Sequence, residues 1–590
     1  MLSLAQLNHA TQAEFSQALQ AVYPKAPWIA ERAGSARPLA TLAALKHALV
    51  RTVREASRDE QLALIRAHAD PADPAAPGAQ HAAGAAPAPA DAPSDAGAGH
   101  CTPDELARIH ALRADYSARF GWPFVLALRG PRGSGLRAAQ IIATLERRID
   151  NPPEFEFAEA LRQLHRMAEL RLNDAFGFVP EQGQRVWDWC ERLARHSEQP
   201  GGLTVTYLSD AHRAAAAEIA ATMRDCGFDQ VDIDAVGNVV GVYHGDDPAA
   251  RRLLTGSHYD TVRNAGKYDG RIGHFIPMAC VRALHLAGRR LPFGLEVVAF
   301  AEEEGQRYKA TFLGSGALVG NFRPEWLDQP DRDGVRMRDA MRQAGLPGDL
   351  AAIATLRRDP ARYLGFVEVH IEQGPVLNAL DLPLGIVSSI NASVRHMGEI
   401  IGMASHAGTT PMQVRRDAAC AAAELALFVE RRAAADGDSV GTVGMLEVPA
   451  GSINVVPGRC RFSLDLRAPS DAQRDGLRDD VLAELAALCA RRGLRYQVEE
   501  AMRESAAPSD AAWQHRWEQA VAALGLPLHR LPSGAGHDAM KLHTAMPQAM
   551  LFVRGEHAGI SHNPLESSTA DDLDLACAAF TRLLDQVATS

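Results

Sequence analysis

Apolar residues recur at helical spacing through the first 68 residues, for example in FSQALQAVY, LATLAALKHALVRTVREA and EQLALIRAHAD, and this period predicts helices. The pattern stops at residues 69–99, which are almost entirely Ala, Pro, Gly and Asp and predict a flexible loop with little to bury. It resumes at Thr102, where Pro103 and Glu105 complete the arrangement of a capping box. Residues 1–176 are therefore predicted to form an all-α bundle.

Strand-like and helix-like runs alternate beyond residue 176. RRLLTGSHYDTV and LEVVAFAEEEG are typical of strands, and a helical run through FIPMACVRALHLAG lies between them. This alternation predicts an α/β domain built from residues 177–386 and 501–590. Residues 387–500 follow a different order, strand-helix-strand-strand-helix-strand, which predicts a small ferredoxin-like α+β domain inserted into the α/β domain.

Composition narrows the class of protein. A chain of 590 residues exceeds one hydrophobic core, and about three domains are expected. The net charge of −11 is spread along the chain without a basic stripe, which argues against a nucleic-acid ligand. No apolar run reaches the roughly 18 residues of a membrane span, and the N-terminus lacks a secretory pattern. Eight cysteines without CxxC pairs indicate reduced thiols in a cytoplasmic protein.

Acids and histidines follow several predicted strands of the α/β domain, where sites form in such sheets. Adjacent carboxylates at a strand end repel one another unless a cation is present. Donors without cysteine favour Zn²⁺, Mn²⁺ or Co²⁺. Asp260 is placed to accept the second ring N–H of His258 and orient the ring. Strand alternation would put Glu302 and Glu304 on one face. The candidate donors are His258, Asp269, Glu302, Glu303, Glu304, His370 and His562.

A dozen motifs, among them GSHYDTV, KYDGRIG, FAEEEGQR, VEVHIEQGP, SHAGTTPM, NVVPG, LDLRA, PSGAGHDAM and ISHNPLES, resemble those of allantoate amidohydrolases and N-carbamoyl-L-amino-acid hydrolases. These enzymes belong to the dinuclear metallopeptidase superfamily, and the resemblance covers residues 180–590. It implies two divalent ions, with Asp269 bridging them and Glu303 as general base. The terminal ligands that it implies are His258, Glu304, His370 and His562.

The same resemblance implies that residues 387–500 form a lid through which the protein makes a homodimer. His406 would donate to the oxyanion that forms on the scissile carbonyl, and Arg467 would grip a substrate carboxylate. A salt bridge at the strand end is the alternative for Arg467. The implied substrate-binding residues are His406, Asn454, Arg467, Gln373 and His537.

The N-terminal segments VYPKAPWIAERA, IRAHADP and CTPDELARIHALRADYSARFGWPFVLALRG resemble OHCU (2-oxo-4-hydroxy-4-carboxy-5-ureidoimidazoline) decarboxylases. The resemblance implies that His68 is catalytic in proton transfer, which imidazole suits near neutral pH. Two departures stand out. Ala69 replaces the family's proline, and the family's Ser-x-x-Glu-Gln motif falls on residues 89–93, where the nearest acids are Asp91 and Asp95. The bundle is thus either a working decarboxylase or a non-catalytic interaction module.

Together these patterns predict a bifunctional enzyme of ureide (purine) catabolism that acts on small ureide substrates. The C-terminal part would hydrolyse allantoate with release of ammonia and CO₂, because the preceding domain resembles an enzyme whose product is one ring-opening away from allantoate. N-carbamoyl-L-amino acids and ureidoglycolate remain alternative substrates, since all carry a ureido group and a carboxylate. An exopeptidase is a third alternative.

Overall fold

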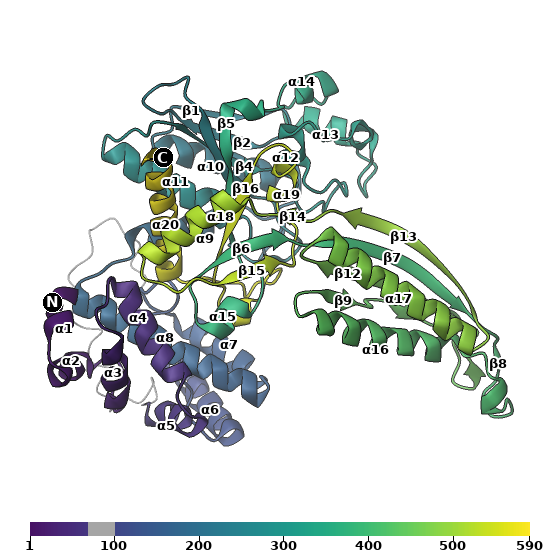
Figure 1. The fold of residues 1–590 in the computed structure, drawn as a ribbon, viewed down its shortest axis with the longest axis horizontal. Coiled ribbons are helices and arrows are strands. Elements are labelled where there is room, and N and C mark those ends of the chain that lie inside the picture. The colour runs from purple at the N-terminus through teal and green to yellow at the C-terminus, as the bar shows by residue number, and fades with distance from the viewer. Residues whose placement is uncertain (69–100, 590) are drawn as a thin grey trace.

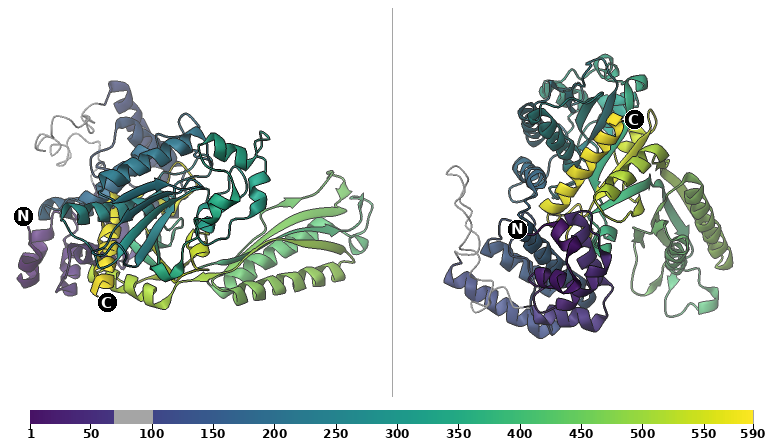
Figure 2. Two further views of the ribbon diagram at one scale, coloured as in Figure 1. Left: turned by 90° about the horizontal axis from the view of Figure 1, so that it is seen from above. Right: turned by 60° about the vertical axis from the view of Figure 1, so that its left-hand side comes forward.

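The computed structural model describes residues 1–68 and 101–589, and the segment with the departures at Ala69 and residues 89–93 lies outside them. Figure 1 shows three parts: a helical bundle at the N-terminus, a central sheet with helices around it, and a long arm formed by residues around 400–500. Both views of Figure 2 show this arm extending away from the rest of the molecule. An all-α N-terminal region and an α/β region were expected, and both are confirmed.

The N-terminal bundle consists of helices that pack around two apolar cores. The larger core includes Phe15, Leu45 and Ile65, and the smaller one includes Tyr116. The capping box predicted at Thr102 is confirmed, because its side chain accepts from the Glu105 N–H while the Glu105 carboxylate accepts from the Thr102 N–H. The helices are α1 (Leu4–His9), α2 (Gln12–Leu19), α3 (Pro27–Ala33), α4 (Leu42–Arg54), α5 (Arg58–Ala67), α6 (Pro103–Phe120), α7 (Ala138–Ile149) and α8 (Pro153–Phe176).

The central sheet has nine strands in the order β1-β2-β4-β3-β5-β16-β6-β14, with β15 beside β6. Its middle strands β4, β3, β5 and β16 are parallel, so their carboxyl ends meet at one edge. The strands are β1 (Gln230–Ile233), β2 (Val239–Tyr243), β3 (Arg252–His258), β4 (Gly294–Phe300), β5 (Tyr363–Ile371), β6 (Leu384–Ile390), β14 (Ala507–Pro508), β15 (Arg530–Ser533) and β16 (Gln548–Val553).

Helices cover this sheet and bury its apolar side chains in the largest core of the molecule. Strands β3 and β4 are buried along almost their whole length, as expected for a parallel sheet covered on both faces. The helices are α9 (Glu181–Leu193), α10 (Asp210–Asp225), α11 (Arg271–Leu286), α12 (Leu313–Leu318), α13 (Met337–Gln343), α14 (Leu350–Ala354), α15 (Val376–Leu380), α18 (Ala511–Ala523), α19 (Ala539–Leu542) and α20 (Ala570–Thr589).

The arm is an antiparallel sheet with two long helices on one face (Figure 1). Its strands run in the order β10-β12-β7-β13, with β9 also paired to β12, and the helices pack their apolar side chains on it. A separate two-stranded antiparallel sheet of the short strands β8 and β11 forms the far tip. The elements are β7 (Ala392–Ile401), β8 (Ser405–His406), α16 (Ala418–Asp436), β9 (Val440–Thr442), β10 (Leu446–Glu447), β11 (Val455–Val456), β12 (Arg459–Ala468), α17 (Asp471–Arg491) and β13 (Arg495–Glu504).

All eight cysteines lie within the described residues, and each is a free thiol. Among the helices of residues 1–68 and 101–589, none combines the length and the apolar character needed to cross a bilayer.

Candidate metal centre

The parallel strands bring the predicted donors to one edge of the central sheet. His258 is the last residue of β3 and His370 lies near the end of β5. Asp269 lies two residues before the start of α11, and a Cβ on the intervening Gly270, whose φ is +67°, would lie 2.5 Å from the His258 ring. Glycine is therefore required at this turn for Asp269 to approach the histidine.

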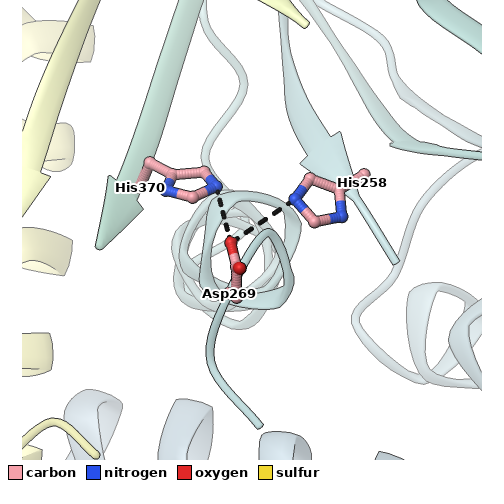
Figure 3. A group of neighbouring side chains, drawn as sticks. All are labelled: His258, Asp269 and His370. Carbon is pink, nitrogen blue, oxygen red and sulfur yellow. Dashed lines mark ion pairs between the residues drawn. The ribbon is translucent and has the colours of Figure 1, made fainter. Parts of the chain in front are cut away.

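One oxygen of Asp269 faces two histidines. The distances from Asp269 Oδ1 are 3.5 Å to Nε2 of His258 and 3.3 Å to Nε2 of His370. Figure 3 shows both rings directed at this carboxylate from opposite sides, with Asp269 at the end of its helix. All three side chains are buried, and Asp269 Oδ1 finds no hydrogen-bond donor among the described residues. The three ligand atoms form the first set able to hold a cation.

The other oxygen of Asp269 faces a second set. His562 Nε2 lies 3.1 Å from Asp269 Oδ2 and 3.5 Å from Oε1 of Glu304. The side chain of His562 is half exposed, whereas Glu304 is mostly covered. These three residues again place their ligand atoms within 4.8 Å of one another. Asp269 is thus common to both sets, as a bridging carboxylate would be.

The ring nitrogens are oriented for metal binding. His258 Nδ1 lies 3.0 Å from the carbonyl oxygen of Asp260, and His370 Nδ1 lies 2.8 Å from that of Ile371. A carbonyl only accepts, so both Nδ1 atoms carry a proton and Nε2 is the atom of each ring that faces Asp269. The Gly270 N–H also donates to Nε2 of His370, at 3.2 Å. Imidazole nitrogens beside a carboxylate oxygen that has no hydrogen-bond donor are a donor set for Zn²⁺, Mn²⁺ or Co²⁺, and these residues fit such ions.

The role expected for Asp260 needs correction. Its main-chain carbonyl orients His258, whereas its carboxylate lies 3.9 Å from the ring nitrogen. The two carboxylate oxygens instead accept from the backbone N–H groups of Glu303 and Glu304, at 3.1 and 3.2 Å. Asp260 therefore positions the glutamate segment as well as the histidine.

The side chains of Glu302, Glu303 and Glu304 do not alternate as in a strand, because β4 ends before Glu302. The strand stops at Phe300, and Glu302 has a left-handed φ of +55°, so the strand alternation expected for Glu302 and Glu304 is wrong. Glu303 and Glu304 both lie within ligand distance of His258. Glu302 is buried elsewhere, with Oε1 accepting from the Tyr308 N–H at 3.4 Å.

The charges of the cluster perturb one another strongly. Burial and the nearby Asp269 together raise the pKa of Glu304 to about 7. Burial also raises the pKa of Glu303 well above its usual range, with Glu304 adding to this. The hydrogen bond with Asp269 raises the pKa of His562 to about 9. A site that raises carboxyl pKa values in this way gains free energy from any bound cation.

Two carboxylates that the sequence analysis did not single out support these donors. Glu566 Oε1 accepts from the backbone N–H groups of Tyr268 and Asp269, at 2.8 and 3.0 Å. Glu368 accepts from the Ser257 hydroxyl at 2.7 Å and from the Ala539 N–H at 3.1 Å. The signal for both was their place inside the motifs that contain His562 and His370, at spacings of four and two residues.

Of the predicted substrate-binding residues, two lie at the cluster. Gln373 Nε2 donates to Asp269 Oδ2 at 2.9 Å and lies 3.4 Å from Nε2 of His562. His537 is only 2% exposed, its ring centre lies 4.5 Å from that of His370, and its Nε2 bonds to the Ser533 hydroxyl at 2.8 Å. Its position therefore supports the His370 ring and does not favour the direct substrate contact that was expected.

The other three predicted residues lie on the arm. Arg467 is held by both oxygens of Asp465, at 2.9 and 2.8 Å, and donates to the Gly534 carbonyl at 2.6 Å. The salt bridge considered as its alternative is therefore present. His406 and Asn454 are exposed at the two-stranded sheet of β8 and β11 at the tip of the arm, and Figure 1 shows β8 far from β5 and β16. The chain does not bring these two residues to its own cluster.

In the N-terminal bundle, His68 caps the C-terminus of α5. Burial, together with the nearby Arg171 and Lys25, lowers its pKa to about 4. The imidazole is therefore neutral at physiological pH. Asp91, Asp95 and the rest of the predicted decarboxylase motif lie outside the described residues.

Comparison with known families separates the chain into two parts. Residues 8–173 match the model of the OHCU decarboxylase family. Residues 254–586 match the model of peptidase family M20/M25/M40. Both matches agree with the resemblances expected from the motifs.

Individual relatives match the second part. An N-carbamoyl-L-amino acid amidohydrolase from Geobacillus stearothermophilus is 38% identical over 66% of this chain and 95% of its own length. An allantoate deiminase from Arabidopsis thaliana is 34% identical over 67% of this chain and 80% of its own. The crystal structure of an amidase of the hydantoinase/carbamoylase family from Burkholderia multivorans superposes with a TM-score of 0.65, at 30% identity, over 69% of this chain and 98% of that one.

The two donor sets predict separable losses of metal. His562→Ala removes a donor from the second set only, so metal-free protein titrated with Mn²⁺ by calorimetry should retain one tight site. Asp269→Ala removes the donor common to both sets and should abolish both sites. Loss of both sites in His562→Ala, or of neither, would contradict the assignment of donors to two sets.

Proposed function

The chain belongs to peptidase family M20/M25/M40, and from this premise we propose that its α/β part is a two-metal amidohydrolase acting on a ureido C–N bond. The observation that carries the proposal is the Asp269 carboxylate, with one oxygen directed at His258 and His370 and the other at His562. Mn²⁺, Zn²⁺ or Co²⁺ would be held by these residues together with Glu304. Two such ions lower the pKa of a shared water and polarise the scissile carbonyl.

In this proposal Glu303 is the general base. It lies within ligand distance of His258 and Glu304 but is not part of the two sets that share Asp269, so we assign to it the proton transfer and not a metal. Asp260 fixes its backbone. The carboxylate takes the proton of the attacking water and passes it to the leaving nitrogen as the C–N bond breaks. Gln373, which donates to Asp269, is positioned to orient the substrate beside the cluster.

We propose allantoate as the substrate, with ammonia and CO₂ released from one ureido group. The support is the domain arrangement, since the OHCU decarboxylase domain shares the chain with the hydrolase, together with the allantoate deiminase among the relatives. The N-carbamoyl-L-amino acid amidohydrolase at 38% identity favours an N-carbamoyl amino acid as the second candidate. Arg467 would pair with the carboxylate of either substrate in exchange for Asp465, so it does not discriminate between them.

The position of His406 and Asn454 supports a homodimer. Both residues are exposed at the tip of the arm, away from the cluster of their own chain. If the arm carries substrate-binding residues, they must act at a metal site that the arm can reach. In a two-fold dimer that metal site is the one of the other copy. In this arrangement His406 of each arm donates to the oxyanion formed in the partner's site.

For the N-terminal domain we propose OHCU decarboxylation with His68 as the catalytic group. The support is the family match and an imidazole kept neutral by burial, which is the form able to accept a proton.

Replacing Glu303 tests the hydrolase. Glu303→Gln should leave both metal sites occupied and lower ammonia release by about 100- to 10,000-fold, the range for loss of a general base. The assay offers allantoate beside N-carbamoyl amino acids and ureidoglycolate, and allantoate should give the highest kcat/KM. The control is Glu302→Gln, which should keep wild-type turnover because burial raises the pKa of Glu302 well above its usual range and the amide mimics a neutral acid. Full turnover in Glu303→Gln would place the base elsewhere.

Mixed dimers test the supply of His406 from a second copy. His406→Ala and Glu303→Gln are each expected to be inactive, yet co-expressed with separate tags they should recover about a quarter of wild-type activity, because half of the dimers then contain one intact site. The control pairs His406→Ala with Asn454→Ala, both changes on the arm, and should recover nothing. No recovery in the first mixture would mean that each chain uses its own His406.

His68→Asn tests the decarboxylase. The variant should lose release of CO₂ from OHCU while ammonia release from allantoate stays unchanged, which serves as the internal control. A wild-type protein that does not accelerate the loss of CO₂ would instead identify the bundle as a non-catalytic module.

A further inference from the structure

The segment that carries His562 has a strained backbone. In residues 554–562, here called the His562 loop, three residues other than glycine have left-handed φ angles: His557 at +54°, Ala558 at +56° and His562 at +54°. Such conformations are unfavourable for residues with a Cβ and persist only where the surroundings hold them. The contacts that hold this loop therefore decide where the imidazole of His562 lies.

Part of the support comes from the hydrolase itself. The Glu556 N–H donates to the Ser567 carbonyl at 2.8 Å, and the Ser568 hydroxyl donates to the Arg554 carbonyl at 3.0 Å, so the loop is closed at its base. Gly559 packs so closely on Gly374 that a Cβ would lie 1.6 Å from its carbonyl oxygen. These contacts fix the ends and one side of the loop, but none of them neutralises the Glu556 carboxylate.

That carboxylate is neutralised mainly from the N-terminal bundle. Arg162 of α8 donates from Nε and Nη2 to Glu556 Oε1, at 3.2 and 2.8 Å, and both side chains are less than a tenth exposed. Although burial opposes it, Arg162 lowers the pKa of Glu556 to about 2, with Arg554 assisting. Arg147 of α7 lies 3.3 Å from the ring of the next residue, His557. Two helices of the bundle thus contact the strained turn.

We infer that the N-terminal bundle braces the His562 loop, and that Arg162 is a positioning residue for the second metal set. Without the Arg162 guanidinium, the buried carboxylate of Glu556 would lose its main positive partner. A buried charge without its partner is strongly destabilising, so the carboxylate would move toward water. Glu556 and His557 would then leave the strained turn, and His562 would be displaced from Asp269 and Glu304. The inference rests on the proposed two-metal function, since it assigns His562 to a metal.

The chain offers a matched control in Arg166, one helical turn further along α8. Arg166 is 2% exposed and is ion-paired to Asp571 in the first turn of α20. It therefore joins the same two domains through a buried pair, yet its partner lies outside the His562 loop. Replacing it removes a buried charge at the domain junction without touching the loop.

The test compares Arg162→Gln with Arg166→Gln in the full-length protein. Metal-free samples are titrated with Mn²⁺ by calorimetry. Arg162→Gln should weaken one of the two sites by about 10- to 100-fold, the usual effect of losing a supporting contact of a ligand, and leave the site of His258, Asp269 and His370 unchanged. Arg166→Gln should bind two ions as the wild type does. Equal effects of the two variants, or two unchanged sites in Arg162→Gln, would overturn the inference.

Hydrogen exchange of the metal-free proteins tests the support of the His562 loop by the bundle independently of the proposed enzymatic function. Backbone amides of residues 554–562 should exchange faster in Arg162→Gln than in Arg166→Gln or the wild type, whether or not the protein hydrolyses a ureide. Glu556→Gln provides a second variant should Arg162→Gln fail to fold, because it removes the partner charge while Arg162 keeps Asp572 within 3.9 Å. Unchanged exchange of the loop in Glu556→Gln would also overturn the inference.

Discussion

The rest of the site is arranged around the carboxylate of Asp269. Its two oxygens lie 3.1–3.5 Å from the Nε2 atoms of His258, His370 and His562, which come from three separate parts of the chain. Main-chain carbonyls fix the rings of two of these histidines, and Glu566 fixes the Asp269 backbone. A buried carboxylate surrounded in this way is stable only with compensating positive charge. The need for that charge accounts both for the histidines placed around Asp269 and for the affinity of the centre for cations.

The architecture follows from the need to bring these groups together. Four parallel strands place their carboxyl ends at one edge, and these strand ends and the loops that follow them carry the donors. The arm is inserted after β6 and returns before β14, so it leaves and rejoins the sheet at the same side of the molecule (Figure 1). This arrangement keeps the metal cluster in the rigid part of the fold and puts His406 and Asn454 on a part that reaches outward.

The buried junction between the bundle and the hydrolase contains several charged side chains. Lys46 and Arg166 meet Asp571, and Arg162 meets Glu556, all with little exposure. Buried pairs of this kind add little net stability but strongly disfavour any arrangement that separates the partners. The two domains are therefore held in one relative position, whatever the activity of the bundle, and one of these pairs lies on the loop that carries His562.

The helical bundle, the α/β alternation and the donor types could be predicted from the sequence because each depends on local pattern: helical period, apolar strands, and acids or histidines directly after them. The capping box at Thr102 is a contact within four residues, and it was predicted correctly. The face on which Glu302 lies was predicted wrongly, since β4 ends two residues earlier and a left-handed residue breaks the alternation. Strand period describes side chains only while the strand continues.

The sequence by itself determined which residue types stand at the strand ends, and hence the chemistry that they can perform. Only the tertiary structure decided that the carbonyl of Asp260, and not its carboxylate, orients His258, that His537 lies against His370, and that Arg162 meets Glu556 across 394 positions of the chain. These contacts depend on how distant segments pack, and neither residue of such a pair carries a local signal of its partner. Sequence periodicity encodes neighbours along the chain, whereas the support of a metal ligand comes from neighbours in space.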